Sequence, residues 1–423
     1  MQTNSRRALA GAGIFAAVVC GVAFFALPSD REVAERITEL AEAKLGVRVT
    51  LGKVHWSLLP RPSIEIEDAA TVQPEPISFK RLVAHPRLAD LVRRKLVFKD
   101  LTIDGGVMPQ LSLRGLKVQP GPSGAANPKA VVETLTFRDL TWVTRFGNRL
   151  EFDGTAQFDA GWRPRTAVLT RPGVTPATQL TLTRQGDEDR WQAQIQVGGG
   201  TADGQLELKG QDGGGMELSG ELAPRNIEVE SAMQAFKRHS AVRGRASGKT
   251  LLSASGKNLG ELARSLHTRT MFSMSPATLV RLDVDKAIRT FGKDRSGQTQ
   301  LKTLTGQMDT QNSADGMKVS YSNLQARGET FSAAGGGTIF KRQIEGEVKV
   351  DIAGGLVGVP LKLSGSLDAP QVTVPASAMA GATAGAVVGT AVLPGIGTAI
   401  GAAIGATMGN LFGGRKDTDP PKR

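Results

Sequence analysis

The chain has 423 residues, a formal net charge of +12 and an isoelectric point near 9.9. Its 51 glycines and its aromatic content of only 5% argue against several compact enzyme-like cores and for many turns between short strands. The positive charge does not indicate nucleic acid binding, because no basic run is interleaved with aromatic side chains and the densest basic cluster spans only residues 93–95. We interpret the basic residues as scattered surface charge and expect no nucleic acid partner.

The N-terminus carries an uncharged apolar run from Ala8 to Leu27, close to the ~20 residues that a helix needs to cross a bilayer. Two arginines precede it, which predicts a cytoplasmic N-terminus with the remaining chain on the other side of the membrane. We predict that residues 1–28 are a retained transmembrane anchor, with a cleaved signal peptide as the alternative. The only cysteine, Cys20, lies in this run, so no disulfide can form within the chain.

A helix is predicted directly after the anchor. Residues 29–32 read Ser-Asp-Arg-Glu, a capping box in which the serine and the glutamate satisfy backbone amides at the start of a helix. Gly46 marks the expected end, because glycine readily adopts the left-handed conformation of a helix C-cap. The apolar residues of this helix fall on one stripe, consisting of Val33, Ile37, Leu40 and Ala41.

The stretch from Gly46 to Asp68 predicts two strands joined by a corner. Apolar and polar residues alternate on both sides of Gly52, and the run closes at two prolines, which cannot donate to a strand ladder. A hairpin of this kind cannot bury its apolar face alone, so it must belong to a larger sheet. The alternating apolar positions are Val47, Val49, Leu51, Val54, Trp56, Leu58, Ile64 and Ile66, of which the first three are candidates for contact with an apolar ligand.

The remaining chain is divided by residues 119–130, a Pro- and Gly-rich linker that follows the module of residues 29–118. Residues 131–375 are predicted to be rich in short antiparallel strands, with short helices between 230 and 292. The clearest strand runs from Ile344 to Ile352, with apolar side chains on one face and charged side chains on the other. Further candidates for apolar ligand contact in this region are Leu206, Leu208, Ile344, Val348, Val350, Ile352, Leu361 and Leu363.

The C-terminal segment has no charged residue from Ala369 to Gly414 and repeats glycine at every fourth position. Such spacing places a bare ridge along a helix and permits close helix packing in lipid. We predict a glycine-zipper helical hairpin in a membrane over residues 376–414 and a disordered tail over 415–423, with a flexible linker as the alternative to the hairpin. The packing glycines are Gly381, Gly385, Gly389, Gly397, Gly401, Gly405 and Gly409.

Signatures of catalysis are missing from the sequence. The four histidines, His55, His85, His239 and His267, lie too far apart in sequence for a metal site on one helix. No Gly-x-Ser-x-Gly elbow occurs, and the triple glycines at 198–200 and 213–215 lack the helix and lysine of a phosphate loop. We therefore expect no enzyme, no cofactor and no metal.

The stretch Gly-Val-Arg-Val-Thr-Leu-Gly-Lys-Val-His-Trp-Ser-Leu-Leu-Pro at residues 46–60, followed by Ile-Glu-Ile-Glu-Asp, resembles the start of AsmA-like proteins. Val-Pro-Leu-Lys-Leu-Ser-Gly-Ser-Leu-Asp-Ala-Pro-Gln-Val at residues 359–372 is similar to their C-terminal end. The two similarities bracket nearly all of residues 46–375. The resemblance implies a protein anchored in the inner membrane of Gram-negative bacteria with its bulk in the periplasm. It also implies a relationship to bridge-like lipid-transfer proteins.

Together these features predict a mainly β fold with short helices and a long twisted antiparallel sheet, which must either roll up on itself or cover its apolar face with a ligand. The resemblance implies the second arrangement, in which the sheet forms an apolar groove. The leading functional hypothesis is a lipid conduit or carrier that supports outer-membrane biogenesis. It is anchored through residues 8–27, has a second membrane contact through 376–413, and has phospholipids or other acyl lipids as partners. The alternative is a non-catalytic assembly or scaffold factor that binds envelope proteins through sheet edges.

Overall fold

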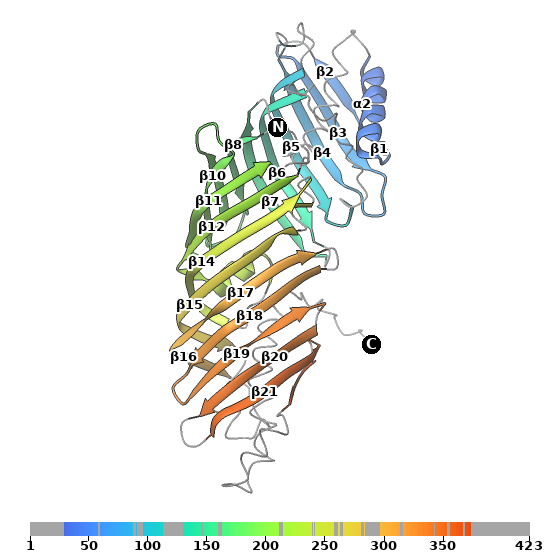
Figure 1. Ribbon diagram of the computed structural model, residues 1–423. Coiled ribbons are helices and arrows are strands. Elements are labelled where there is room, and N and C mark those ends of the chain that lie inside the picture. The colour runs from blue at the N-terminus through green and yellow to red at the C-terminus, as the bar shows by residue number, and fades with distance from the viewer. Residues whose placement is uncertain are drawn as a thin grey trace, which may run out of the picture. The chain divides into compact units, whose positions relative to one another are not determined.

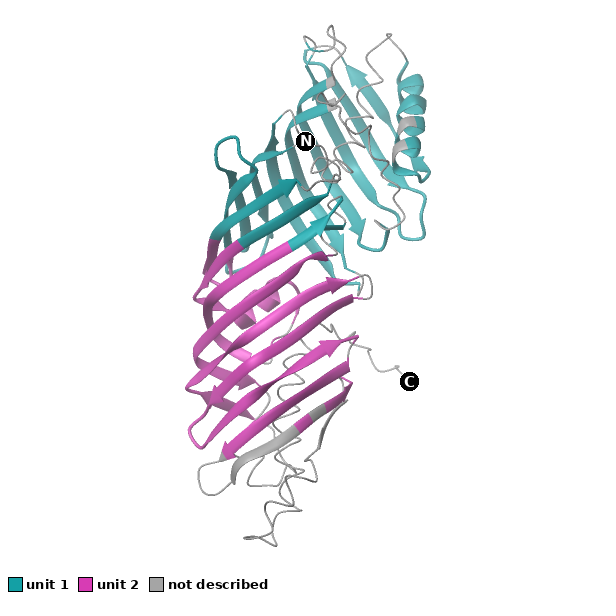
Figure 2. Ribbon diagram, in the orientation of Figure 1, with its two compact units in different colours: residues 1–195, 204–220, 254–263 teal, residues 196–203, 221–253, 264–423 magenta. Residues whose placement is uncertain are grey.

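The computed structural model is mainly β, and its strands form a mixed sheet that does not close on itself (Figure 1). It divides into two compact units (Figure 2): unit 1 comprises residues 1–195, 204–220 and 254–263, and unit 2 comprises 196–203, 221–253 and 264–423. The structure describes residues 29–57, 60–87, 90, 96–112, 130–144, 147–159, 163–210, 215–238, 240, 242–257, 261–262, 265–280, 283, 297–313, 316–341, 343–352, 356–366 and 369–373.

Helix α2 (Asp30–Leu45) confirms the predicted helix of unit 1. Ser29 and Glu32 form the expected capping box, and Gly46 ends the helix in the left-handed conformation at φ 68°. Val33, Ile37 and Ala41 are fully buried in one hydrophobic cluster with the first strands of the unit. Each large side chain removed from water in this way stabilises the fold by about 1.5–3 kcal/mol, so α2 is firmly attached to its sheet face.

The predicted corner at Gly52 is present. Strands β1 (Val49–Thr50) and β2 (Val54–Ser57) both pair with the same return strand, β3 (Ser63–Thr71), in antiparallel register. A Cβ at Gly52 would lie 2.8 Å from the carbonyl oxygen of Glu67, so only glycine fits where the chain bends against β3. The first strand is shorter than the alternation predicts, because Val47 and Arg48 lie outside it.

One pairing in unit 1 corrects the prediction of a purely antiparallel sheet. Strand β4 (Ser78–Pro86) pairs antiparallel with β5 (Leu96–Pro109), but β5 pairs parallel with β6 (Ala130–Val143). A parallel pair requires a crossover of about a dozen residues or more, and residues 110–129 provide that length. The predicted linker thus lies in the segment that connects β5 with its parallel partner β6. Residues 113–129 of this segment lie outside the described part of the chain.

Four neighbouring strands of unit 1 are irregular at the same level. At this level the regular pairing passes over one residue on each strand. These residues are Asp68 on β3, Lys80 on β4, Gly105 on β5 and Asp139 on β6, and all of them except Lys80 have a positive φ. The ammonium nitrogen of Lys80 lies 3.8 Å from a carboxylate oxygen of Asp139. The register of β3 with β4, of β4 with β5 and of β5 with β6 is the same on both sides of this level, so the strands share one interruption of the alternation. The further strands that begin in unit 1 are β7 (Arg149–Phe158), β8 (Pro164–Thr170), β9 (Gln179–Arg184), β10 (Arg190–Val197) and β12 (Met216–Arg225).

Unit 2 is built from long antiparallel strands and one short helix, α4 (Val229–Ala235), which confirms the first of the helices predicted between 230 and 292. Strand β15 pairs with both β16 and β17, and pairing continues in order from β17 to β22. The strands are β11 (Gly200–Gly210, shared with unit 1), β13 (Ile227–Glu228), β14 (Val242–Gly256), β15 (His267–Val280), β16 (Gln298–Leu301), β17 (Thr303–Ser313), β18 (Gly316–Arg327), β19 (Phe331–Phe340), β20 (Gln343–Ile352), β21 (Leu356–Ser366) and β22 (Ala369–Thr373).

Several predictions fall on residues that the structure does not describe. These are the anchor at 1–28, the glycine-zipper hairpin at 376–414 and the tail at 415–423, together with residues 258–260, 263–264, 281–282 and 284–292 of the region predicted to contain short helices. Among the described residues of this region, 261, 262 and 265 are helical. Within the described ranges, no helix combines the length and apolar character needed to cross a membrane.

Candidate functional site

Strand β20 separates apolar from charged side chains completely. Ile344, Val348 and Val350 are between 2% and 3% exposed. The residues between them, Glu345, Glu347, Lys349 and Asp351, are exposed on the opposite face. The alternation predicted from the sequence is therefore confirmed, and it defines an apolar face and a charged face for the neighbouring strands.

The apolar face continues over the strands paired with β20. Val350 lies opposite Ala333 of β19 and Val348 opposite Gly335, while Ile344 lies opposite Ile339. Beyond β19, Tyr321 of β18 lies directly between Gly337 of β19 and Met308 of β17. We call this surface the apolar face of unit 2; it consists of Met308, Val319, Tyr321, Leu324, Ala333, Gly335, Gly337, Ile339, Ile344, Gly346, Val348 and Val350.

The charged side chains of these strands lie on the other face. Arg269 of β15 contacts Asp309 of β17 at 2.9 Å, and His267 contacts the same carboxylate at 3.3 Å. Burial opposes ionisation of Asp309, but hydrogen bonds from Gln307 and Arg269 outweigh it and lower the pKa of the carboxyl group. Among the described positions on the apolar side of β15 and β17–β20, none carries Lys, Arg, Asp or Glu.

Tyr321 is a polar group with a buried hydroxyl in the apolar face, on the side of the sheet that also carries Thr310 opposite Val319. Its ring packs with Leu324 against Ile339 and Ile344. Its hydroxyl oxygen is buried, and the structure gives it no hydrogen-bond partner in the part of the chain that it describes. Burial raises the pKa of the Tyr321 hydroxyl, so the group stays neutral and is a hydrogen-bond donor over the whole physiological range.

Two glycines follow Tyr321 in its cross-strand row, on the side away from Met308. Gly337 of β19 lies directly opposite Tyr321, and Gly346 of β20 lies directly opposite Gly337. A Cβ at Gly346 would lie 2.6 Å from the carbonyl oxygen of Gly336 and 2.9 Å from Cα of Gly337. The two strands therefore approach too closely for a side chain, and the row beside the tyrosine is bare backbone.

The first three candidate contact residues lie in a different environment from the one predicted. Val49 is 4% exposed, and Val47 and Leu51 pack against the same hydrophobic cluster that contains the apolar stripe of α2. The chain's own helix α2 thus packs on this part of the sheet. The alternation of these three residues is that of a sheet face packed under an amphipathic helix.

The other candidates are placed as follows. Leu206 and Leu208 are half-buried on β11, whereas Ile344, Val348 and Val350 belong to the apolar face of unit 2. By register, Ile352 lies opposite Phe331, Leu361 opposite Val348 and Leu363 opposite Gly346. The structure therefore brings the β20 and β21 candidates together within unit 2, whereas Val47, Val49 and Leu51 belong to the hydrophobic cluster of unit 1.

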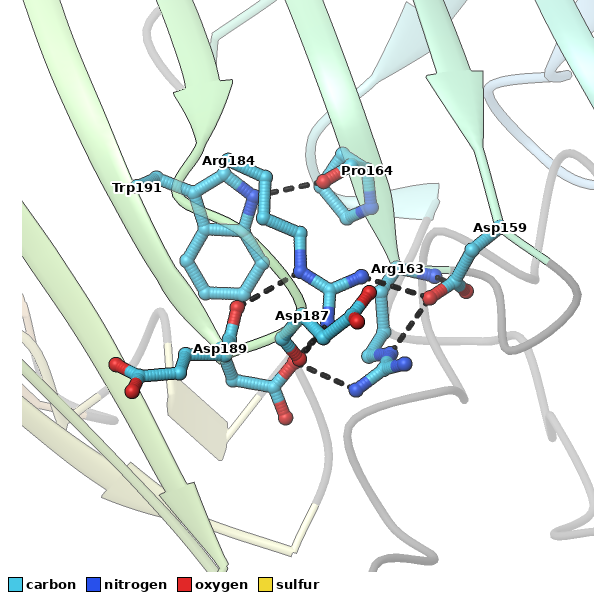
Figure 3. A network of polar contacts seen from close by, with 8 residues as sticks. Asp159, Arg163, Pro164, Arg184, Asp187, Asp189 and Trp191 are labelled. Carbon is cyan, nitrogen blue, oxygen red and sulfur yellow. Dashed lines mark hydrogen bonds and ion pairs between the residues drawn. The ribbon is translucent and has the colours of Figure 1, made fainter.

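A second cluster, in unit 1, was not predicted from the sequence. Two arginines and two aspartates form four ion pairs where β7 connects to β8 and β9 connects to β10 (Figure 3). Arg184 contacts Asp159 at 2.7 Å and Asp189 at 3.5 Å, and Arg163 contacts the same two carboxylates at 2.8 and 3.1 Å.

The Arg184 side chain is only 5% exposed, and its remaining donors reach the carbonyl oxygens of Asp187 and Glu188. Trp191 lies beside the cluster and donates from Nε1 to the carbonyl oxygen of Pro164 at 2.7 Å. Because the charges compensate one another, we interpret the cluster as a link between two turns. The only sequence signal for this cluster is that Asp159 and Arg163, which carry opposite charges, lie four residues apart.

The described residues contain no group of His, Cys, Asp and Glu side chains arranged to hold a metal ion. Comparison with known proteins adds one finding. The glycine-zipper family matches residues 378–420, which confirms the glycine zipper predicted from the four-residue spacing. No curated protein and no solved structure matches the chain.

Proposed function

We propose that this chain is an inner-membrane-anchored envelope protein that binds acyl lipids, phospholipids among them, on the apolar face of unit 2. It acts as a lipid conduit or carrier in outer-membrane lipid homeostasis. The observation that carries the proposal is the segregation on β20, where Ile344, Val348 and Val350 share one face and all the charged residues share the other. A surface of long strands without a single ionised group suits hydrocarbon chains.

Two further features support a membrane setting. The uncharged run at 8–27 has the length of a transmembrane helix, and the glycine-zipper match at 378–420 covers the segment whose spacing suits helix packing in lipid. The protein would then contact membrane at both ends of the chain. The similarity of residues 46–60 and 359–372 to AsmA-like proteins agrees with this reading.

The test is to place a charge on each face of β20 in turn. Val348→Asp introduces a carboxylate into the apolar face, whereas Lys349→Asp changes the next residue on the charged face. Full-length protein would be purified in amphipol and its bound lipids extracted and quantified by mass spectrometry. We expect bound phospholipid in the wild type and in Lys349→Asp. In Val348→Asp the amount of bound phospholipid should fall at least tenfold, because a buried unpaired carboxylate excludes hydrocarbon.

Since Val348 is 3% exposed, Val348→Asp could also perturb folding. Val348→Thr keeps the branched shape of the side chain and replaces one methyl group with a hydroxyl, so it is the second variant, with folding monitored by circular dichroism. The proposal predicts a smaller but measurable lipid loss for this folded variant. Wild-type protein that carries no more lipid than a soluble control would refute lipid binding altogether.

A scaffold function is the second candidate, and one observation favours it. Leu251 and Met271, on neighbouring strands β14 and β15, are 41% and 48% exposed, and both lie on the face that also carries Lys249 and Arg269. If changing these two residues to Ser abolished envelope function while Val348→Thr preserved it, protein contact through the charged face would be favoured over lipid binding.

A further inference from the structure

The hydroxyl of Tyr321 is an unusual group to find in the apolar face of unit 2. Three buried side-chain atoms have no hydrogen-bond partner within the described residues, namely Nε2 of Gln73, Oγ1 of Thr178 and the hydroxyl oxygen of Tyr321. Of these, only Tyr321 lies in the surface that we propose to carry lipid. A buried hydroxyl without a partner costs about 1–3 kcal/mol, and phenylalanine would pack the same ring without that cost.

The surroundings restrict what could satisfy this donor. The apolar side of β15 and β17–β20 carries no described cation, so an anionic phosphate would find no counter-charge beside Tyr321. A neutral carbonyl oxygen needs only one donor and tolerates apolar neighbours such as Ile339 and Ile344. In an acyl lipid, the ester carbonyl is the acceptor that lies between the hydrocarbon chain and the headgroup.

The geometry leaves backbone rather than side chains next to the phenol. Gly337 and Gly346 follow Tyr321 along one cross-strand row, and neither contributes a side chain. At about 4.8 Å per strand, the two glycines span about 10 Å of bare sheet. An extended hydrocarbon chain can lie along such a strip with its first carbonyl at Tyr321.

We propose that the Tyr321 hydroxyl donates a hydrogen bond to the ester carbonyl of an acyl lipid lying on the apolar face of unit 2. The inference rests on the proposed lipid-binding function and adds the chemical group that is recognised. The ionised headgroup remains outside this face, and Tyr321 fixes how far the acyl chain extends along it.

The experiment compares two lysolipids that differ only in the carbonyl. Full-length protein in amphipol would be titrated with 1-lauroyl-lysophosphatidylglycerol and with its 1-O-dodecyl ether analogue, both below micellar concentrations. Wild type should bind the ester about fivefold more tightly, the range expected for one neutral hydrogen bond. Tyr321→Phe should bind both lipids with the affinity that wild type shows for the ether.

Thr178→Val is the matched control, because it removes another buried hydroxyl without a partner, from a residue of unit 1. It should leave the ester preference unchanged. Tyr321 is also the only tyrosine of the chain, so tyrosine labelled with ¹³C at Cζ gives a single resonance. That resonance should shift when the ester is added and stay in place when the ether is added.

The outcomes separate the two proposals. Equal binding of ester and ether by wild type, or an ester preference that survives in Tyr321→Phe, would overturn the role of Tyr321 and leave lipid binding intact. Binding of neither lysolipid by wild type would overturn both proposals. If the partner of the hydroxyl is a buried water instead, the wild type should bind ester and ether equally, and neither lipid should shift the Tyr321 resonance.

Discussion

At the scale of single residues, the Arg184 cluster shows how a buried charge is tolerated in unit 1. Arg184 is almost inaccessible, yet it contacts two carboxylates and two carbonyl oxygens. Removing one partner from a buried ion pair usually costs more than the pair itself contributes, because the remaining charges keep their desolvation cost. The free energy of unfolding should therefore depend strongly on Arg184 and only weakly on nearby exposed ion pairs.

We predict that Arg184→Met lowers the free energy of unfolding by about 3 kcal/mol. Arg190→Met is the matched control, since Arg190 pairs with Glu188 and Glu207 but its side chain is 41% exposed. That substitution should change the stability by less than about 1 kcal/mol. Urea unfolding followed by tryptophan fluorescence measures both, and equal losses would contradict a structural role specific to the buried cluster.

At the scale of elements, glycines decide how closely the strands of unit 2 approach. Gly346→Ala would force a Cβ to within 2.6 Å of the carbonyl oxygen of Gly336 on the neighbouring strand. We expect overpacking to lower the free energy of unfolding by about 1–3 kcal/mol. Lys349→Ala, an exposed change on the same strand, should cost less than about 0.5 kcal/mol. Denaturant melts of both variants test this, and a neutral Gly346→Ala would show that the strands can separate.

The elements also show which sequence signals are sufficient. The capping box at Ser29 and the strict alternation from Ile344 each report a local requirement, and both predictions are confirmed. The interruption shared by β3 to β6 could not be predicted. On β3 the buried positions shift from Ile64 and Ile66 to Ala69, because Asp68 changes which residues face the core. A period of two therefore fails wherever the alternation is interrupted in this way.

At the scale of the whole molecule, pairings between distant segments were the hardest to foresee. The parallel pairing of β5 with β6 depends on where residues 110–129 return the chain, which no local pattern encodes. Covering of Val49 by α2 likewise depends on tertiary packing, since an apolar strand face has the same sequence pattern whether a helix or a ligand covers it. The burial of alternate residues on β20 was thus predictable from the sequence, whereas the packing of α2 on β1 was not.

The central claim is that acyl lipid lies on the apolar face of unit 2, and photocrosslinking in living cells tests it most directly. Met308 and Met271 are matched positions on neighbouring strands, the first on the apolar face and the second on the charged face, 48% exposed. Each would be replaced by p-benzoylphenylalanine and irradiated, and lipid adducts would be identified by mass spectrometry. We predict phospholipid adducts at position 308 and none at 271; adducts confined to 271, or equal at both positions, would contradict the account.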